Sequence, residues 1–426
     1  MLLTTLAFAQ PQSLIAEVSS GLYRDPIDMA LEPAVLGQVT ETNVLGTLAT
    51  RSPGPALGTV RPWGPGTLAV WVEGAGLRAT QDDANTLEGE TAGTFNGAAV
   101  SGGQLWLAYG TGRFGLAMGS RVAYVGQTAV AQFYGTPTLS TAPYDSDTDP
   151  GLYSDFFFQH DVVLGIGLGD SNQSTELDLL YRYELDRPYV QASLTQANAR
   201  FETKGLWEPA SLLENRMGHS GGVRLDSTVP LEEGELRILV EARVGVYEPA
   251  SDSLIDIGEV DGDTVYRRDM ELQGARLLTG QGTGLVARHH QLQHLELRYG
   301  VAFGVWTGTG GWTRSEVIYQ GEDTTTVEEE HLGRWTALGL TLPAMVLVPL
   351  GDRVGLVLAG TAGWGSVSSD ESYQVTGGDG ERTTSSAMST VHTGVVGLRL
   401  EPSESVRVDL ATSTLQDLQM SAVWRF

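Results

Sequence analysis

The chain contains no cysteine in its 426 residues, and only one of its 26 basic residues, Lys204, is lysine. Without cysteine there can be no disulfide framework, no thiolate metal site and no cysteine nucleophile. Basic residues are also scarce beside the 52 acidic ones, which leaves a formal net charge of -26. Because phosphate binding requires a basic surface, this balance argues against nucleic acid as a partner.

Long hydrophobic runs are missing as well. The longest uninterrupted apolar run in the C-terminal half, residues 342–350, contains two prolines and is too short to cross a bilayer as a helix. Mean hydropathy is close to zero, at -0.08. Such a value is expected when apolar and polar residues alternate along the chain.

Alternation with a period of two is the dominant pattern. In the closing segment, one face of the expected strand carries Leu418, Met420, Ala422, Trp424 and Phe426. Successive side chains of a strand point to opposite faces, so this segment has one apolar face that ends in aromatic residues. Similar alternation recurs about ten times, for example in residues 114–124, 162–168 and 295–305, whereas a helix would show a period of 3.6. The fold class is therefore all-β.

The opposite faces of these strands separate a membrane barrel from a soluble sandwich. They carry small residues, single arginines and opposed charges, which suit a confined polar lumen. The candidate lumen-lining residues are Arg121, Asp178, Arg182, Arg237, Glu241, Arg243, Glu296, Arg298, Arg399, Arg407 and Asp409. We therefore predict a transmembrane antiparallel up-and-down β-barrel in the bacterial outer membrane, with lipid against its exterior.

Short and long connections between the expected strands alternate. Residues 401–404 form a short turn, which we expect at the periplasmic rim because the carboxyl end must finish there. Acidic stretches at residues 252–263, 322–330 and 370–381 are expected as long extracellular loops. We predict 14 strands, within a range of 14–16. The number depends on whether residues 43–50 form a strand and on whether residues 312–319 span the membrane or extend an outer hairpin. It also depends on how residues 189–202 are divided.

The amino end has a different character. Residues 1–9 end in the small-x-small pattern of a signal peptide but lack its basic region, so either the true start lies upstream or these residues form a buried leader. Residues 10–37 have helical spacing and include Pro26 and Pro33, which open and end a short helix. We expect this segment to fold inside the barrel as a plug, and residues 38–426 to form the barrel.

Three stretches carry a family resemblance. Residues 25–36, the run Asn43-Val-Leu-Gly-Thr-Leu and residues 103–119 resemble the early part of the outer-membrane long-chain fatty-acid and hydrocarbon transporter family. The resemblance implies a barrel of 14 strands, a hatch in the lumen and lateral release of apolar substrates. The family's Asn-Pro-Ala plug motif falls on Glu32, Pro33 and Ala34, so Glu32 departs from it.

Other constellations offer little chemistry. Asp145, Asp147 and Asp149 have the alternate spacing of a calcium loop, but Pro150 displaces the glycine that such loops need, and a solvated acidic loop is the alternative. Adjacent His289 and His290 would point apart in a strand, even with His294 nearby. Ser220 beside His219 lacks a recognisable activating arrangement. We expect no enzyme activity and no cofactor.

Three functions fit a large barrel with these features. The first is passage of small hydrophobic molecules through a plugged lumen. An open, wet lumen lined by arginines would instead make the chain a general diffusion pore. The third is a non-transporting scaffold that binds a partner protein through its acidic extracellular loops.

Overall fold

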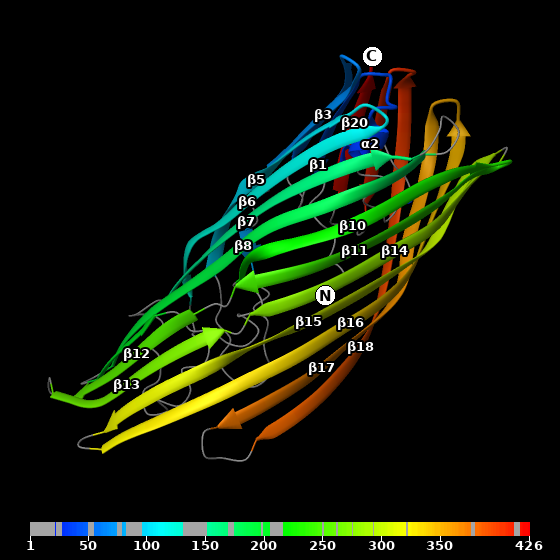
Figure 1. Cartoon of the computed structure of the whole chain (residues 1–426). Coiled ribbons are helices and arrows are strands. Elements are labelled where there is room, and N and C mark those ends of the chain that lie inside the picture. Colours follow the sequence, from blue (N-terminus) through cyan, green and yellow to red (C-terminus); the bar gives the residue numbers. More distant parts are fainter. Residues whose placement is uncertain are drawn as a thin grey trace.

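The computed structural model describes a closed antiparallel barrel (Figure 1). The described residues are Leu22 and residues 28–49, 55–74, 79–81, 96–130, 151–168, 174–196, 199–204, 216–248, 251–260, 263–274, 276–292, 294–320, 323–375, 380–412 and 418–426. The signal-peptide prediction for residues 1–9 lies outside them. The barrel closes where β1 (Asn43–Ala49) pairs with β20 (Leu418–Arg425), in a register that runs from Asn43 opposite Arg425 to Ala49 opposite Gln419.

Consecutive strands pair around the wall in simple up-and-down order. After β1 they are β2 (Ala56–Trp63), β3 (Gly66–Gly74), β5 (Asn96–Gly110), β6 (Phe114–Val130), β7 (Gly151–Gly167), β8 (Ser174–Gln196), β10 (Arg216–Leu231), β11 (Gly234–Glu248), β14 (Leu277–Leu292), β15 (Leu295–Gln320), β16 (Asp323–Gly351), β17 (Val354–Val375), β18 (Glu381–Ser403) and β19 (Val406–Thr412). With β20 this makes 16 wall strands among the described residues.

The strand number corrects the prediction of 14 and lies at the upper end of the predicted range. Residues 43–49 form β1, because their pairing with β20 is what closes the wall. Residues 312–319 extend β15 and do not form a strand of their own. Residues 189–202 contain the outer end of β8 and most of the short strand β9 (Ala199–Lys204), which pairs with that outer end. The all-β barrel class is confirmed.

The predicted acidic loops are largely strand. β15 continues to Gln320 and β16 begins at Asp323, while β17 ends at Val375 and β18 begins at Glu381. Residues 252–263 fall mostly in β12 (Ser251–Val260), which pairs with β13 (Asp263–Gly274). β13 in turn pairs with the outer half of β15, and the short β4 (Ala79–Gln81) pairs with β5. Both faces of this extracellular extension meet water, so its strands continue without apolar alternation.

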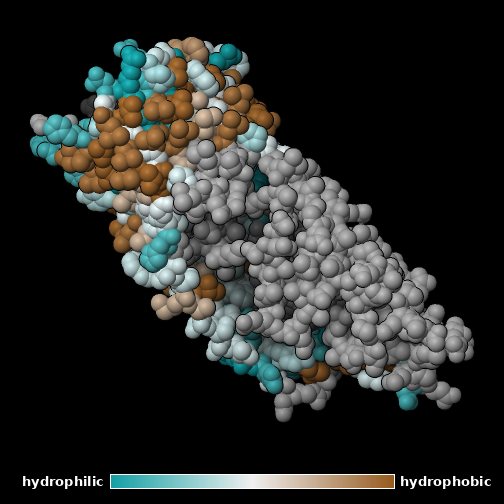
Figure 2. Space-filling model, turned by 180° about the vertical axis from the view of Figure 1, so that it is seen from behind, coloured by the Kyte–Doolittle hydropathy of each residue, from teal (hydrophilic) through white to brown (hydrophobic). Residues whose placement is uncertain are grey.

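The exterior of the barrel carries an apolar belt. On the face seen in Figure 2, hydrophobic residues gather in a band near the end that holds the short turns. Belt side chains on the outward face are well exposed, for example Val244 at 69%, Phe114 at 66% and Leu57 at 60%. Water would not favour so much exposed apolar surface, whereas lipid does. The predicted location, the bacterial outer membrane, is confirmed by this closed barrel with its outward apolar belt.

The turns and the carboxyl end occupy the same rim. Tight turns join β2 to β3, β5 to β6, β10 to β11, β16 to β17 and β18 to β19. Gly64 and Gly112 have positive φ values of 60 and 87 degrees, which the turn geometry requires and which glycine adopts at no steric cost. This is the periplasmic rim, because outer-membrane barrels have their short turns on that side. Two short helices, η1 (Asp28–Leu31) and α2 (Pro33–Leu36), lie near it. None of the described helices is long and apolar enough to cross a bilayer.

Candidate functional site

The helices η1 and α2 lie inside the barrel at its periplasmic end. They contact β3 and the consecutive strands β5, β6, β7 and β8. Ala30, Ala34 and Leu36 are fully buried. Ala30 and Leu36 belong to a core that includes Trp71 and Trp106 of the barrel wall. Residues 28–36 therefore fill this side of the lumen, and we refer to them as the plug.

Three glycines bring the plug against the wall. Gly110 of β5, Gly115 of β6 and Gly165 of β7 lie opposite one another in a single cross-strand row. A Cβ atom on any of the three would collide with the backbone of Pro33 or Ala34, or with the carboxylate of Glu176. Since any other residue would carry that atom, the close backbone approach depends on glycine at all three positions.

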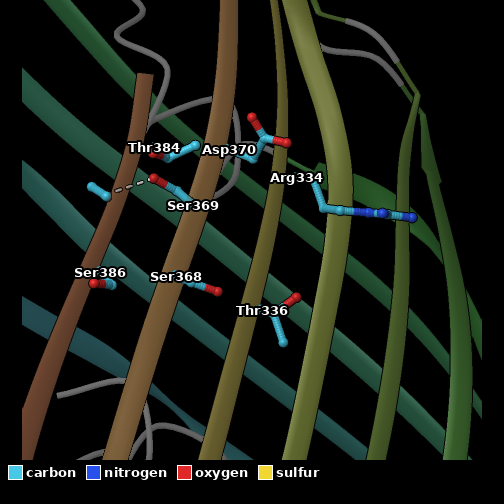
Figure 3. Close-up of a pocket in the computed structure, with 8 residues that line it drawn as sticks. Arg334, Thr336, Ser368, Ser369, Asp370, Thr384 and Ser386 are labelled. Atoms are coloured by element: carbon cyan, nitrogen blue, oxygen red, sulfur yellow. Dashed lines mark hydrogen bonds between the residues drawn. The ribbon is translucent and has the colours of Figure 1, made fainter. Parts of the chain in front are cut away.

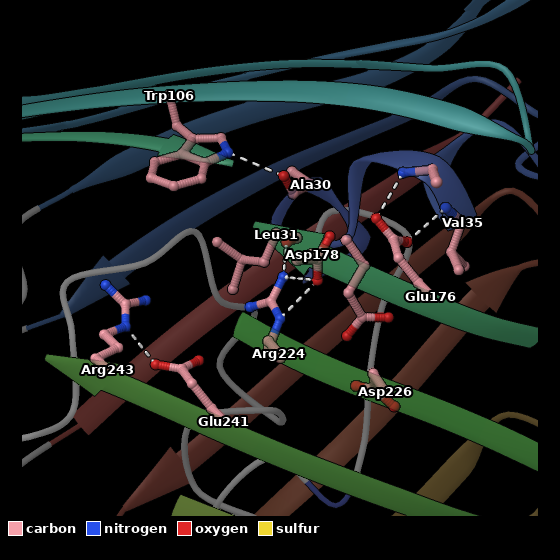
Figure 4. Close-up of polar contacts among 12 residues, drawn as sticks. Ala30, Leu31, Val35, Trp106, Glu176, Asp178, Arg224, Asp226, Glu241 and Arg243 are labelled. Atoms are coloured by element: carbon pink, nitrogen blue, oxygen red, sulfur yellow. Dashed lines mark hydrogen bonds and ion pairs between the residues drawn. The ribbon is translucent and has the colours of Figure 1, made fainter. Parts of the chain in front are cut away.

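Glu176 of β8 holds the first turn of α2. Its two carboxylate oxygens accept hydrogen bonds from the backbone N–H groups of Ala34 and Val35, each at 2.8 Å (Figure 4). These amides are among those that a helix start leaves without internal partners. On the other side, Nε1 of Trp106 donates to the carbonyl of Ala30 at 3.0 Å. Glu176 is fully buried, so the contact is shielded from water.

Two arginines complete the attachment of the plug. Arg224 of β10 donates to the Leu31 carbonyl and, through Nε, to Asp178 at 2.8 Å. Arg237 of β11 bridges Asp226 and Glu32, with 3.2 Å between its Nη2 and Oε1 of Glu32. Glu32 is thus paired with a wall cation. Pro33 and Ala34 rest on the glycine row.

Leu22 occupies the opposite side of the lumen. It is only 6% exposed and packs in a second core with Leu285, Met345, Val357 and other wall residues. Nη1 of Arg298 donates to the Leu22 carbonyl at 3.0 Å, while Nε of the same arginine contacts Glu296 at 2.5 Å. Leu22 therefore covers the floor of this half of the lumen.

The predicted lumen-lining residues all lie on inward positions of the wall. On strands β6 to β11 they form pairs above the plug: Arg182 holds Asp161 through Nε at 2.6 Å and Nη2 at 3.2 Å, and Nε of Arg243 contacts Glu241 at 2.5 Å. Arg121 is exposed to the lumen. We call the inward face of β6, β7, β8, β10 and β11 the charged half. Near the rim on the other side, Asp409 accepts from Arg399 and Arg407, at 2.8 and 2.9 Å.

Strands β15 to β18 present a contrasting inner face. Their inward faces carry Glu296, Arg298 and Arg399 toward the periplasmic end and Arg314, His331 and Glu371 toward the outer end. Between these ends the inward positions are Gly300, Ala302, Gly304, Trp306, Gly308 and Gly310 on β15; Gly333, Trp335, Ala337, Gly339, Thr341, Pro343, Met345 and Leu347 on β16; Gly355, Val357, Ala359, Thr361, Gly363, Gly365, Val367 and Ser369 on β17; and Ser385, Ala387, Ser389, Thr393, Val395 and Gly397 on β18. None of these side chains is ionisable. We call this set the uncharged sector.

The uncharged sector runs from the extracellular extension down to Leu22. Near its outer end the indole rings of Trp306 and Trp335 lie close to Gly308 and Gly333, where a Cβ atom would strike them. Both rings are half-buried, so part of each faces the lumen. At its lower end the sector meets the core around Met345 and Leu22. The result is an uncharged wall through the middle of the barrel, opposite the charged half.

The wall has a gap in its pairing beside this sector. β15 and β16 pair in one register throughout, except that Gly300 and Val301 are not paired with Pro343 and Leu342. Proline lacks the N–H that a ladder needs, so it weakens the wall where it occurs. We call this gap the Pro343 seam. Met345, two residues along β16, is part of the core that contains Leu22.

Other sequence candidates do not form a reactive site. His219 faces outward and its Nδ1 lies 2.7 Å from the Tyr181 hydroxyl, whereas Ser220 is on the opposite face. His290 stacks on Tyr299 outside the barrel, and His289 points inward toward Glu296. In the described part of the chain, no group of three acidic or histidine residues is placed to hold a metal. The calcium candidates Asp145, Asp147 and Asp149 lie outside the described residues.

Comparison with solved structures finds other barrels. The toluene transporter TbuX of Ralstonia pickettii matches with a TM-score of 0.36 and 9% identity over 98% of each chain. The P. putida toluene transporter TodX gives 0.34 and 10%, over 95% of this chain and 94% of that one. The ferric yersiniabactin uptake receptor FyuA from Yersinia pestis gives 0.35 and 6%, over 91% and 80%.

Two of these three neighbours are described as toluene transporters and the third as a ferric yersiniabactin uptake receptor. At such low identities and TM-scores, however, the likenesses assign neither a family nor a substrate to this chain. No family model matches the chain, and no curated protein matches it either. The function therefore has to be argued from the chain's own lumen.

Proposed function

We propose that this chain is an outer-membrane transport barrel that passes small hydrophobic molecules along its uncharged sector. The carrying observation is that the inward positions of four neighbouring strands, β15 to β18, lack ionisable side chains through the middle of the barrel, between Arg298 and Arg399 toward the periplasmic end and Arg314, His331 and Glu371 toward the outer end. A desolvated apolar molecule gains nothing from the charged half, where guanidinium and carboxylate groups satisfy one another. Along the uncharged sector it exchanges water for Trp306, Trp335, glycine and aliphatic contacts.

The exit that we propose is lateral. The floor of the sector is covered by Leu22 within a packed apolar core, so a molecule descending the sector meets a barrier there. The Pro343 seam lies beside that floor, and Val301 and Leu342, on its outward side, are 44% and 39% exposed in the apolar belt. A hydrophobic molecule leaving by this route enters lipid without crossing water.

A charge placed in the sector tests the proposal. Thr341 faces the lumen on β16 and is half-buried among apolar neighbours. Thr341→Glu adds a carboxylate that a passing apolar molecule must approach without water, and a barrier raised by about 1.4 kcal/mol slows entry about tenfold. The measurement is uptake of the small apolar fluorophore N-phenyl-1-naphthylamine into vesicles that contain the purified full-length barrel.

The matched control puts the same side chain on the opposite wall. Ser220 also faces the lumen, on β10, and lies opposite Arg182 in the charged half. Ser220→Glu should leave uptake of the fluorophore unchanged, because the new carboxylate joins groups that are already ionised. Equal losses in the two variants would contradict a route along β15 to β18.

The two alternative functions have less support. A general diffusion pore needs an open path, whereas the plug and Leu22 occupy both sides of the lumen near its periplasmic end. Swelling of vesicles in a neutral sugar such as arabinose measures this directly, and we expect the intact chain to give none. Binding of a partner protein at the extracellular extension stays a prediction, as does the absence of enzyme activity and of a cofactor.

A further inference from the structure

A group of polar residues interrupts the apolar exterior just above the belt. On β17 the outward face changes from Trp364, which is 44% exposed, to Ser366, Ser368 and Asp370 at every second position. On β16 the change runs from Leu338 to Thr336 and Arg334, and on β18 from Met388 to Ser386, Thr384 and Arg382. The three strands pair in register, so these residues form one outward patch.

The patch contains a shallow pocket of about 370 Å³ (Figure 3). Its outward lining residues are Arg334, Thr336, Ser368, Asp370, Thr384 and Ser386. Four of the six carry hydroxyl groups, each able to donate one hydrogen bond and to accept others. Figure 3 also shows that the Arg334 side chain extends away from Asp370. We call these six residues the exterior pocket.

An ion pair fixes the acidic member of the pocket. Arg382 donates to the Asp370 carboxylate through Nε at 2.7 Å and Nη2 at 2.5 Å. These hydrogen bonds lower the pKa of the Asp370 carboxyl below its ordinary value, so it stays an acceptor at neutral pH. The side chain of Arg382 is 71% exposed. The pocket therefore offers hydroxyls, one fixed carboxylate as an acceptor for hydroxyl groups, and a guanidinium that suits phosphate.

We propose that the exterior pocket binds the phosphorylated saccharide head group of an outer-leaflet glycolipid. Its position favours a lipid-borne ligand, since Trp364 and Leu338 directly below it lie in the belt that contacts acyl chains. Sugar hydroxyls match the serine and threonine side chains, and a phosphate matches Arg334. The proposal depends on the outer-membrane location and not on passage through the lumen.

The test compares two outward arginines at opposite ends of the wall. The full-length protein is reconstituted in phosphatidylethanolamine and phosphatidylglycerol vesicles with lipopolysaccharide, and bound lipopolysaccharide is counted by native mass spectrometry in mild detergent. Arg334→Ala should lower its apparent affinity about tenfold, because a charge-assisted contact is lost. Arg61→Ala is the matched control: Arg61 shares the outward face of β2 with Leu57 and Trp63 near the periplasmic rim. It should bind like the unaltered chain.

Additional variants and a competition measurement distinguish the possible outcomes. Equal binding by Arg334→Ala and Arg61→Ala would overturn the proposal, as would displacement of the glycolipid by a soluble phosphorylated disaccharide at equal concentration, which would assign the pocket to a free sugar phosphate. If Arg334→Ala fails to fold, as judged by the heat-induced shift of the barrel on a gel, the pair Ser368→Ala and Ser386→Ala replaces it, with the same expected loss. Thr341→Glu should bind normally, so failure of transport and failure of this proposal are distinguishable.

Discussion

The charged half and the uncharged sector hold the amino-terminal segment in different ways. In the charged half, Glu176, Arg224 and Arg237 make hydrogen bonds and ion pairs to the plug, and the glycine row brings backbone against backbone. Beside the uncharged sector, Leu22 is held by apolar packing, and its carbonyl accepts a hydrogen bond from Arg298.

The difference indicates which side of the lumen opens. Charge-assisted bonds between buried groups need correct geometry and cost much to break, because each separated partner is left desolvated. Apolar packing is non-directional, so Leu22 can move and be replaced by another apolar molecule at little cost. Under the proposed function, the attachment in the charged half keeps the plug in place, while the contacts around Leu22 yield to the hydrophobic molecule that we propose as the substrate.

Removing the main attachment of the plug should have the largest effect. Glu176→Ala removes two buried hydrogen bonds and leaves the amides of Ala34 and Val35 without their acceptor, which costs about 1–3 kcal/mol for each unsatisfied group. We expect arabinose-driven swelling of vesicles to change from none to a rate typical of a pore. Glu248→Ala, at the exposed end of β11, is the control and should stay closed. A closed Glu176→Ala barrel would mean that the polar contacts do not retain the plug.

Locking the wall should have the next largest effect. The chain has no cysteine, so paired cysteines can be introduced without side reactions. A disulfide between Val301→Cys and Leu342→Cys spans the Pro343 seam, and under oxidising conditions it should reduce uptake of the apolar fluorophore to the level of protein-free vesicles. Reduction should restore uptake.

The control for this lock uses the same two strands. Val305 and Leu338 are paired residues of β15 and β16 on the outward face. A disulfide between Val305→Cys and Leu338→Cys should leave uptake intact, because the wall is already hydrogen-bonded there. If both disulfides block uptake, or if neither of them does, the Pro343 seam is not the exit.

The smallest expected effect comes from loosening the floor. Leu22→Ala removes a buried leucine side chain, a change that costs about 2–5 kcal/mol in a packed core. We expect uptake of the apolar fluorophore to rise several-fold without arabinose swelling. Leu31→Ala loosens the plug on the other side, in the core with Trp106, and should not raise fluorophore uptake. A rise in both variants would remove the distinction between the two sides.

The barrel could be predicted from the sequence because lipid imposes alternation. Every wall strand within the belt must turn apolar side chains outward, and this left a readable pattern in residues such as those of β6 and β15. Outside the belt that constraint vanishes. The outer parts of β16 and β17 were therefore interpreted as loops, although their backbone pairing continues to Glu329 opposite Val375.

Alternation in the sequence predicts which side chains turn inward, but it does not predict which side chains they contact there. Alternation places Asp178, Arg182 and Glu241 inside, yet the partners of these groups depend on register between strands that are distant in sequence. Glu176, the main contact of the plug, was missed even though it shares the inward face of Asp178 two residues away. The role of Gly110, Gly115 and Gly165 can be recognised only in retrospect, because their common row and the close approach of the plug appear only once the strands are aligned.

The junction between α2 and β1 limits what the plug can do once it is released. Thr42 exchanges backbone hydrogen bonds with Phe426 at the closing edge of the wall, and only residues 37–41 separate it from Leu36. Fully extended, so short a tether spans about 20 Å. A detached plug consequently stays at the mouth of its own barrel, and its return is an intramolecular event at high effective concentration. A plug detached by Glu176→Ala would thus remain able to reseal the barrel from which it came.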